Sequence, residues 1–269
     1  MIGKIGKFIL NFIVAILLIL SVLPFILMVL AAFQHTQTLD FKIRWDALTF
    51  DNFATLFQYH GFGSAMLLSA SVVVIACVMN IIVCSLAAYG FTFKRFPGSE
   101  AMFWIYMATM MVPRQVTVIA MFVLFNKLGI LGTTISLALP AIDAFGVFLV
   151  RQFMQGIPES LLEAAKIDGA TDWMIFRKII LPLVKPVLTA LTVFTFLATW
   201  NDFLWPLVSL GSDESQTVTL AISKLQGAFL TEYGLVMAGT TIAFSVPFIA
   251  YVLLQRQFVE GVAASGIKG

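Results

Sequence analysis

Residues 163–186 read EAAKIDGATDWMIFRKIILPLVKP, a markedly polar interval in a chain that is 60% hydrophobic and only 11% charged. Charged side chains gather here around the Asp-Gly pair at 168–169. Glycine adopts the positive φ that helix ends commonly require, at no steric cost. The pair therefore predicts that one helix ends here and that a second begins after a turn.

The first arm of this helix-turn-helix is expected over about 158–167. Pro158 suits the first turn of a helix, Glu159 favours the positive end of the helix dipole, and the residues that follow are good helix formers. We expect this arm to display its small and apolar side chains, Leu161, Leu162, Ala164 and Ala165. Physical reasoning leaves two interpretations open: a solvated connector on the membrane surface, or a docking knob that enters a groove on a cytoplasmic partner.

The second arm is expected to begin at Thr171, whose side chain can cap a helix, with Asp172 favourably placed in the first turn. Apolar residues recur at helical spacing along this arm, namely Trp173, Phe176 and Ile180. Because proline interrupts helical hydrogen bonding, we expect the arm to stop near Leu181-Pro182.

The rest of the chain indicates a bilayer protein, because a mean hydropathy of +0.99 lies far outside the range of soluble proteins. Six apolar runs are long enough to cross about 30 Å of hydrocarbon. They cover residues 8–33, 63–93, 101–125, 133–150, 186–208 and 235–255. Backbone polar groups cannot stay unpaired in lipid, so the sequence predicts an all-α, polytopic membrane protein. No soluble domain is expected, and residues 1–269 are predicted to form one transmembrane domain with a cytoplasmic excursion over about 151–185.

Basic residues indicate the orientation, because Lys and Arg collect on the cytoplasmic side. One side of the predicted topology carries Lys4, Lys7, Lys94, Arg95, Arg151, Lys166, Arg177, Lys178, Lys185, Arg256 and Lys268. The other side carries only Lys42, Arg44, Lys127 and Lys224. We therefore expect both termini to be cytoplasmic. The first apolar run is too long for a secretory signal, so we expect it to be a retained helix.

Ionisable residues inside predicted spans are costly and are candidates for function. There are three of them: Arg114, Asp143 and Asp202. Counted along unbroken helices at about 1.5 Å per residue, Arg114 and Asp202 reach a similar depth and Asp143 does not. We therefore expect Arg114 to pair with Asp202.

The fifth span carries a polar stripe at helical spacing, made of Thr192, Thr195, Thr199 and Asp202, whereas Asn201 points elsewhere. Such a stripe either packs neighbouring helices closely or faces a translocation path. We expect this face to line the path or its wall. Trp200 and Trp205 could stack on a sugar ring, although packing against neighbouring helices is the expected role.

Several kinds of chemistry lack the residues they need. Cys77 and Cys84 are about 10 Å apart on a helix, too far for a disulfide, and His35 and His60 are far apart in sequence, so no metal site is expected. An intramembrane enzyme lacks a clustered set of catalytic groups. Nothing indicates nucleic acid, and no phosphate-binding loop is present. If ATP powers this protein, another chain must bind it.

The spacing of Glu163-Ala164-Ala165, Gly169 and Ile179-x-Leu181-Pro182 resembles the EAA loop of the membrane subunits of ATP-binding cassette (ABC) importers. Further stretches resemble the sugar-importer permeases of the maltose-transporter type: DGAT at 168–171, TWNDF at 199–203, GIKG at 266–269 and PRQVTVIAMF at 113–122. The resemblance covers essentially the whole chain.

The resemblance implies a multi-pass permease of the bacterial cytoplasmic (inner) membrane that imports a di- or oligosaccharide by alternating access. Its implied partners are a second permease subunit, two copies of an ATP-binding subunit that holds ATP and Mg²⁺, and an extracytoplasmic solute-binding protein. The residues it assigns to ATPase coupling are Glu163, Ala164, Ala165, Asp168, Gly169, Ile179 and Pro182. Two alternatives remain open: the same architecture importing glycerol phosphate or an acidic oligosaccharide, and a carrier or channel that needs no ATP.

Overall fold

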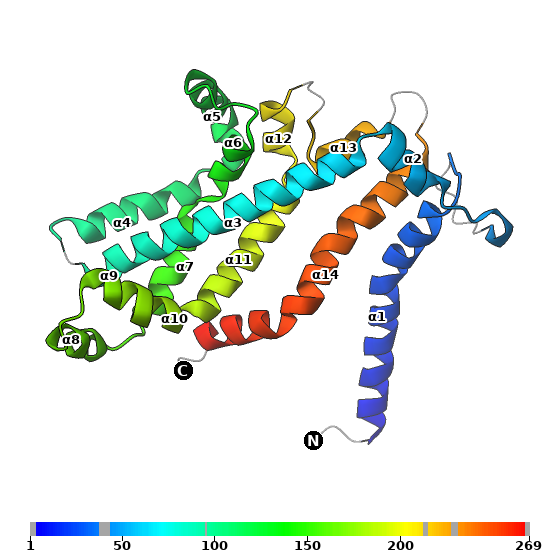
Figure 1. Ribbon diagram of the computed structural model, residues 1–269. Coiled ribbons are helices and arrows are strands. Elements are labelled where there is room, and N and C mark those ends of the chain that lie inside the picture. Colours follow the sequence, from blue (N-terminus) through cyan, green and yellow to red (C-terminus); the bar gives the residue numbers. More distant parts are fainter. Residues whose placement is uncertain (1–3, 38–43, 95, 212–214, 227–230, 267–269) are drawn as a thin grey trace. The chain divides into compact units, whose positions relative to one another are not determined.

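The computed structural model describes residues 4–37, 44–94, 96–211, 215–226 and 231–266 (Figure 1). Helices make up the regular structure of these residues, and only an isolated bridge joins Gln226 and Thr231. In order they are α1 Lys4–Ala32, η1 Trp45–Ala47, α2 Asp51–Tyr59, α3 Phe62–Phe93, α4 Ser99–Ala108, η2 Thr109–Met111, α5 Arg114–Lys127, α6 Thr134–Ala138, η3 Leu139–Ala141, α7 Ala144–Met154, α8 Glu159–Ile167, α9 Asp172–Ile175, η4 Phe176–Ile180, α10 Leu181–Leu183, α11 Lys185–Trp200, α12 Leu204–Ser209, α13 Val218–Lys224 and α14 Tyr233–Gly266. The expected all-α class is confirmed.

Long apolar helices account for half of the predicted spans. In the described part of the chain, Gly6–Ala32, Phe62–Phe93 and Tyr233–Leu253 are each long and apolar enough to cross a membrane. They correspond to the predicted runs 8–33, 63–93 and 235–255. The 18-residue apolar window of α1 has none of its residues buried within the chain, whereas 39% of the window in α3 is buried.

The other three predicted runs are interrupted by bends or breaks. Ser99–Met111 and Arg114–Lys127 meet at 104°, and Thr134–Ala141 and Ala144–Met154 meet at 47°. The fifth run, 186–208, begins after a 74° bend between Asp172–Leu183 and Lys185–Trp200 and breaks again before Leu204. If each bent pair is one span, the described residues hold up to six spans. The six-span topology with cytoplasmic termini stays a prediction.

Proline and capping side chains explain two of these breaks. Pro113 stands in extended conformation immediately before α5, and because it has no N–H it cannot donate the hydrogen bond that would join it to the preceding helix. Asp143 is also extended, and its Oδ1 accepts the N–H of Gly146 at 3.0 Å, which caps α7. Such a cap satisfies a backbone donor that the new helix end would otherwise leave unpaired.

Contacts divide the chain into two compact units: Met1–Ala65 with Leu220–Val246, and Met66–Thr219 with Pro247–Gly269. In the first unit, the buried amide of Asn52 donates to the carbonyls of Ala32 and Gln34 at 2.9 and 3.0 Å, where α1 ends. Gly234 at the start of α14 approaches the same turn, and a Cβ there would stand 1.9 Å from the carbonyl oxygen of Gln34. This glycine is therefore required by the close approach of two backbone segments.

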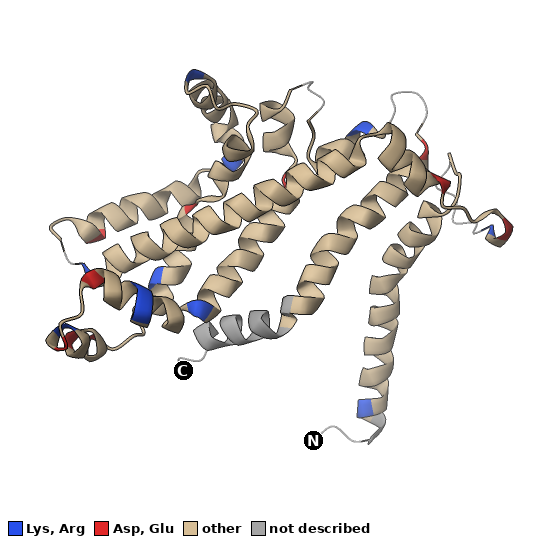
Figure 2. Cartoon of the chain, viewed as in Figure 1, with Lys and Arg blue, Asp and Glu red and all other residues tan. Residues whose placement is uncertain are grey.

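The second unit has a continuous apolar core that includes residues of α3, α4, α7, α8, α9, η4 and α11. Its fully buried side chains include Phe103, Met154, Ile175 and Ile180. Burying one such side chain contributes roughly 1.5–3 kcal/mol, so this core joins α8, α9 and η4 firmly to α3, α7 and α11. Figure 2 shows charged residues gathered around α8 to α10, whereas α3 carries none.

Candidate functional site

The turn between α8 and α9 forms as the sequence predicts. Pro158 stands in extended conformation at the position before the first residue of α8, and its carbonyl accepts the N–H of Leu161 at 3.2 Å. Gly169 has φ +79°, and the N–H of Ala170 donates to the carbonyl of Ala165 at 2.9 Å. This bond satisfies a carbonyl that the end of α8 leaves free, and the positive φ explains why glycine is needed there.

The second arm has the expected extent but is less regular than expected. Thr171 accepts the N–H of Met174 at 3.3 Å, which confirms the predicted cap. The helix then widens into the π-helical turn η4 and ends at Leu183, one residue beyond the predicted stop near Leu181-Pro182. Because Pro182 has no N–H, the usual α-helical bond is impossible at this place, and the wider turn precedes it.

The predicted exposure of the first arm is only half right. Leu161 is 41% exposed and Ala164 is exposed, but Leu162 and Ala165 are buried in the core of the second unit. One face of a short helix must pack, and the helical spacing of 162 and 165 places them together on that face. The outer face instead presents Glu163 and Ile167, the latter 87% exposed.

The remaining coupling candidates lie on both sides of the turn. Asp168 and Gly169 are exposed at the turn, Pro182 is exposed in α10, and Ile179 packs in part against the core. Trp173 shares the helical spacing of the buried Phe176 and Ile180, but it is 59% exposed, and its neighbour Met174 is 41% exposed. The shortness of α9 could have revealed this, because a first helical turn has few neighbours to pack against.

The second arm is attached to the end of α3. Lys94 Nζ lies 2.5 Å from Oδ1 of Asp172, and the hydroxyl of Tyr89 donates to the Asp172 carbonyl at 3.5 Å. The rings of Tyr89 and Phe176 also pack edge to face, with their centroids 5.2 Å apart. The hydrogen bond from Lys94 holds the pKa of the Asp172 carboxyl below its usual value. Figure 1 shows α9 beside the end of α3.

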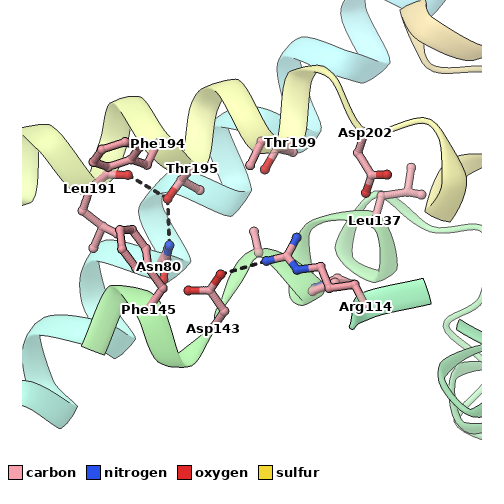
Figure 3. A pocket seen from close by; sticks show the side chains of 13 residues that line it. Asn80, Arg114, Leu137, Asp143, Phe145, Leu191, Phe194, Thr195, Thr199 and Asp202 are labelled. Atoms are coloured by element: carbon pink, nitrogen blue, oxygen red, sulfur yellow. Dashed lines mark hydrogen bonds and ion pairs between the residues drawn. The ribbon is translucent and has the colours of Figure 1, made fainter. Parts of the chain in front are cut away.

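A cavity of about 230 Å³ lies where residues from the broken helices meet in the second unit (Figure 3). Its polar lining comes from α3, the start of α5, the capping residue of α7, and α11 with the turn after it. These side chains are Asn80, Arg114, Asp143, Thr195, Thr199 and Asp202. The aromatic part of the wall is made by Phe145 and Phe194, whose rings meet edge to face at 5.6 Å.

Arg114 pairs with Asp143 and not with Asp202, so the predicted partner was wrong. Nη2 of Arg114 lies 2.8 Å from Oδ2 of Asp143, as the dashed line in Figure 3 marks. The prediction counted depth along unbroken helices, but the bends at Pro113 and Asp143 change the geometry on both sides. Asp202 accepts the N–H of Trp205 at 3.4 Å and also lines the cavity.

The threonine stripe is divided by the structure. Thr195, Thr199 and Asp202 line the cavity, whereas Thr192 does not, and its hydroxyl donates to the carbonyl of Leu188 at 2.8 Å. Asn201 also lies outside the lining and donates to the carbonyl of Leu197 at 2.8 Å.

Asn80 is a lining residue that the sequence argument missed. Its amide donates to Oγ1 of Thr195 at 2.7 Å, and its carbonyl oxygen lies 2.8 Å from Sγ of Cys84. Asn80 is 2% exposed and Thr195 is 5% exposed, so the bond joins α3 and α11 inside the packed interior. A lone amide in a long apolar run is the feature that could have revealed it, because polar side chains in such helices commonly bond across to a neighbour.

Both tryptophans of the fifth run pack within the protein, as expected. Trp200 and Trp205 are each 4% exposed. Trp200 stacks on Phe196, and the indole N–H of Trp205 donates to the carbonyl of Ser136 at 2.9 Å. Neither residue lines the cavity.

Comparison with known proteins identifies the family. Residues 80–263 match the sequence profile of the inner membrane component of binding-protein-dependent transport systems. The chain belongs to this family. The matched region of the permease includes the whole α8–α9 turn and all six polar residues of the cavity lining.

Individual relatives of the permease have related descriptions. It is 36% identical to the lactose transport system permease protein LacG of Rhizobium radiobacter, with 91% of each chain covered. It is 32% identical to the arabinooligosaccharides transport system permease protein AraQ of Halalkalibacterium halodurans, over 95% of this chain and 94% of the relative. The sn-glycerol-3-phosphate transport system permease protein UgpE of Pectobacterium atrosepticum is 34% identical, over 74% of this chain and 73% of the relative.

The fold of the permease is also found in a solved transporter. A crystal structure of a bacterial ABC transporter involved in the import of the acidic polysaccharide alginate has a chain that superposes with a TM-score of 0.84. The match covers 95% of this chain and 97% of the other at 22% identity. The permease is thus a multi-pass inner membrane subunit of a transport system and is not itself an enzyme.

Proposed function

We propose that this permease imports a di- or oligosaccharide by alternating access, driven by ATP-binding subunits that dock on residues 158–169. The observation that carries the proposal is the two-sided packing of α8. Leu162 and Ala165 belong to the core, while Glu163 and Ala164 remain exposed for a partner. A partner that moves the exposed face would therefore move the core attached to the other face.

The energy source is assigned to partner chains. The sequence has no phosphate-binding loop, so ATP and Mg²⁺ would be held by two copies of an ATP-binding subunit. A second permease subunit, completing a heterodimer, and an extracytoplasmic solute-binding protein would complete the importer. The name of the family, which is that of binding-protein-dependent systems, supports the last of these.

The sugar assignment is supported by relatives named for lactose, arabinooligosaccharides and α-glucosides. A second candidate, an anionic solute, is favoured by the relative named for glycerol 3-phosphate and by the structural neighbour from an alginate importer. The two candidates differ in the charge of the solute, which is the property that the cavity lining bears on most directly.

The test is a reconstituted importer, purified with its co-encoded partners and assayed in proteoliposomes. Stimulation of ATP hydrolysis would be measured with the binding protein and a panel of neutral sugars, glycerol 3-phosphate and alginate oligosaccharides. A neutral sugar should stimulate hydrolysis and accumulate inside. Accumulation that does not require ATP would contradict the importer mechanism and favour a carrier or channel.

Coupling is tested by two substitutions in the turn. Glu163→Lys places the wrong charge on the exposed face, and Gly169→Pro forbids the observed φ of +79°. Both variants should reach the membrane but lose sugar-stimulated ATP hydrolysis. Asp46→Lys makes the same charge change at an exposed carboxylate of η1 and should behave as the unmodified protein. Normal coupled transport by both turn variants would exclude this segment as the docking site.

A further inference from the structure

The cavity lining carries no surplus positive charge. Its ionisable side chains are Arg114, Asp143 and Asp202. One guanidinium and two carboxylates sum to a formal charge of −1, or to zero if Asp202 holds a proton. Arg114 is therefore an internal counterion of Asp143, 2.8 Å away, and not a free receptor for an anion.

An anionic solute would meet unfavourable electrostatics in this cavity. It could reach the guanidinium only by competing with Asp143, and Asp202 would face it from the other wall (Figure 3). Like charges repel more strongly in a partly enclosed site than in open water, because the effective dielectric constant is lower there. The lining thus opposes a phosphate or carboxylate and tolerates an uncharged molecule.

The same lining suits hydroxyl groups, each of which both donates and accepts hydrogen bonds. Arg114 supplies donors, since a guanidinium has five N–H groups and only one nitrogen meets Asp143 in the ion pair. Asp143, Asp202 and the hydroxyl of Thr199 supply acceptors. The pair is reachable, because 57% of the Arg114 side chain and 36% of the Asp143 side chain are exposed. Phe145 and Phe194 add an apolar wall for the carbon face of a ring.

The size of the cavity limits what it can hold. Its volume of about 230 Å³ is below the roughly 300–1,000 Å³ of pockets that enclose a drug-sized ligand. It therefore has room for a portion of an oligosaccharide and not for a whole one.

We propose that this cavity is a solute-contact site on the permease, that it takes one uncharged, hydroxyl-rich unit of the solute, and that it disfavours an anion. The proposal rests on the proposed function and narrows its substrate class to neutral saccharides. Thr199 and Asp202 contact the solute, and the ion pair with Asp143 fixes the position of the Arg114 guanidinium that donates to it.

Thiol labelling tests the contact without depending on transport. Thr199→Cys would be introduced into the full importer, in which Cys77 and Cys84 are buried and should give little background. With the binding protein present, lactose or an arabino-oligosaccharide, whichever stimulates ATP hydrolysis, should slow the labelling by a water-soluble maleimide several-fold. Glycerol 3-phosphate should leave it unchanged. Thr189→Cys, on the same helix but outside the lining, should show no protection by either solute.

Transport variants provide the second measurement. Asp202→Asn and Thr199→Val should each raise the KM for the neutral sugar, by about tenfold for Asp202→Asn, because that change removes a charged hydrogen-bond acceptor. Thr189→Val is the matched control. If Asp202→Asn fails to assemble because Asp202 also accepts the N–H of Trp205 at the start of α12, the labelling result decides alone.

The outcomes separate this inference from the proposed function. An importer that takes up a neutral sugar but shows no protection of Thr199→Cys, and an unchanged KM in Thr199→Val, would overturn the contact site and leave the proposed function standing. ATP-driven uptake of glycerol 3-phosphate in preference to every neutral sugar would overturn the substrate class. An importer that takes up no sugar at all would overturn the proposed function first.

Discussion

Gly146 of α7 lies so close to Cys84 of α3 that a Cβ at position 146 would stand 2.6 Å from Sγ. The same Cβ would be 3.2 Å from Oδ1 of Asn80 and from Cδ1 of Leu191. Three helices therefore meet at one glycine. The contact lies next to the cavity, because Asn80 and Leu191 also line it.

Gly146→Ala should destabilise the permease by roughly 1–3 kcal/mol, because the added methyl group overpacks a close helix contact. Thermal unfolding of the purified importer would measure this loss of stability. Combining Cys84→Ala with Gly146→Ala should restore part of the lost stability, because the smaller side chain makes room for the added methyl group. Gly90→Ala in α3 is the control, since nothing lies within 4 Å of a Cβ there. Equal stability of Gly146→Ala and Gly90→Ala would show that the helices are not packed this closely.

The pairing of Arg114 can be measured with double-mutant cycles. Arg114→Ala and Asp143→Ala should couple by up to about 1 kcal/mol, the range of partly exposed ion pairs, when unfolding of the importer is followed. Arg114→Ala and Asp202→Ala should couple more weakly. A larger coupling energy between Arg114→Ala and Asp202→Ala than between Arg114→Ala and Asp143→Ala would contradict the observed pairing and support the pair predicted from the sequence.

The bond between Asn80 and Thr195 should be costly to break from one side. Thr195→Val leaves the buried amide of Asn80 without its acceptor and should destabilise the protein by about 1–3 kcal/mol. Asn80→Leu together with Thr195→Val should cost less than Thr195→Val alone, because no unpaired polar group remains. Thermal unfolding checks this, with Thr189→Val as the control. A loss of stability in the double variant that exceeds the sum of the losses in the two single variants would contradict the prediction.

The link between Lys94 and Asp172 predicts how coupling depends on pH. The pKa of Asp172 is lowered from 3.8 by its hydrogen bond from Lys94, so the carboxylate is favoured in the folded protein. Its stabilisation is complete above the unfolded pKa and is lost only as the pH falls through the still lower folded value.

Between pH 5 and 8 this link should therefore contribute no pH dependence to sugar-stimulated ATP hydrolysis. Asp172→Asn should lower the ratio of stimulated to basal hydrolysis throughout that range. A ratio in the unmodified importer that falls between pH 6 and 5, and that Asp172→Asn makes pH-independent, would contradict the assignment.

Local features were predictable from the sequence, and long-range pairings were not. The turn at Asp168-Gly169 and the cap at Thr171 depend on neighbouring residues, so spacing alone was sufficient. The partner of Arg114 depends on two bends whose angles no periodicity encodes.

The same limit explains the other errors. Asn80 bonds a residue 115 positions away, and a single-sequence argument has no means of finding such a partner. Leu162 and Ala165 pack because the other helices of the core reach that face of α8, which the isolated arm does not reveal.

The bare apolar surface of α1 has a practical consequence. None of the residues in its 18-residue apolar window is buried within the chain, and side chains along it such as Leu18 and Ile19 are 60% and 66% exposed. Whatever surrounds the protein has to cover it, whether acyl chains, a neighbouring subunit or the micelle of a solubilising amphiphile. The choice of amphiphile during purification should therefore affect the position of this helix more than that of any helix in the α3–α11 core.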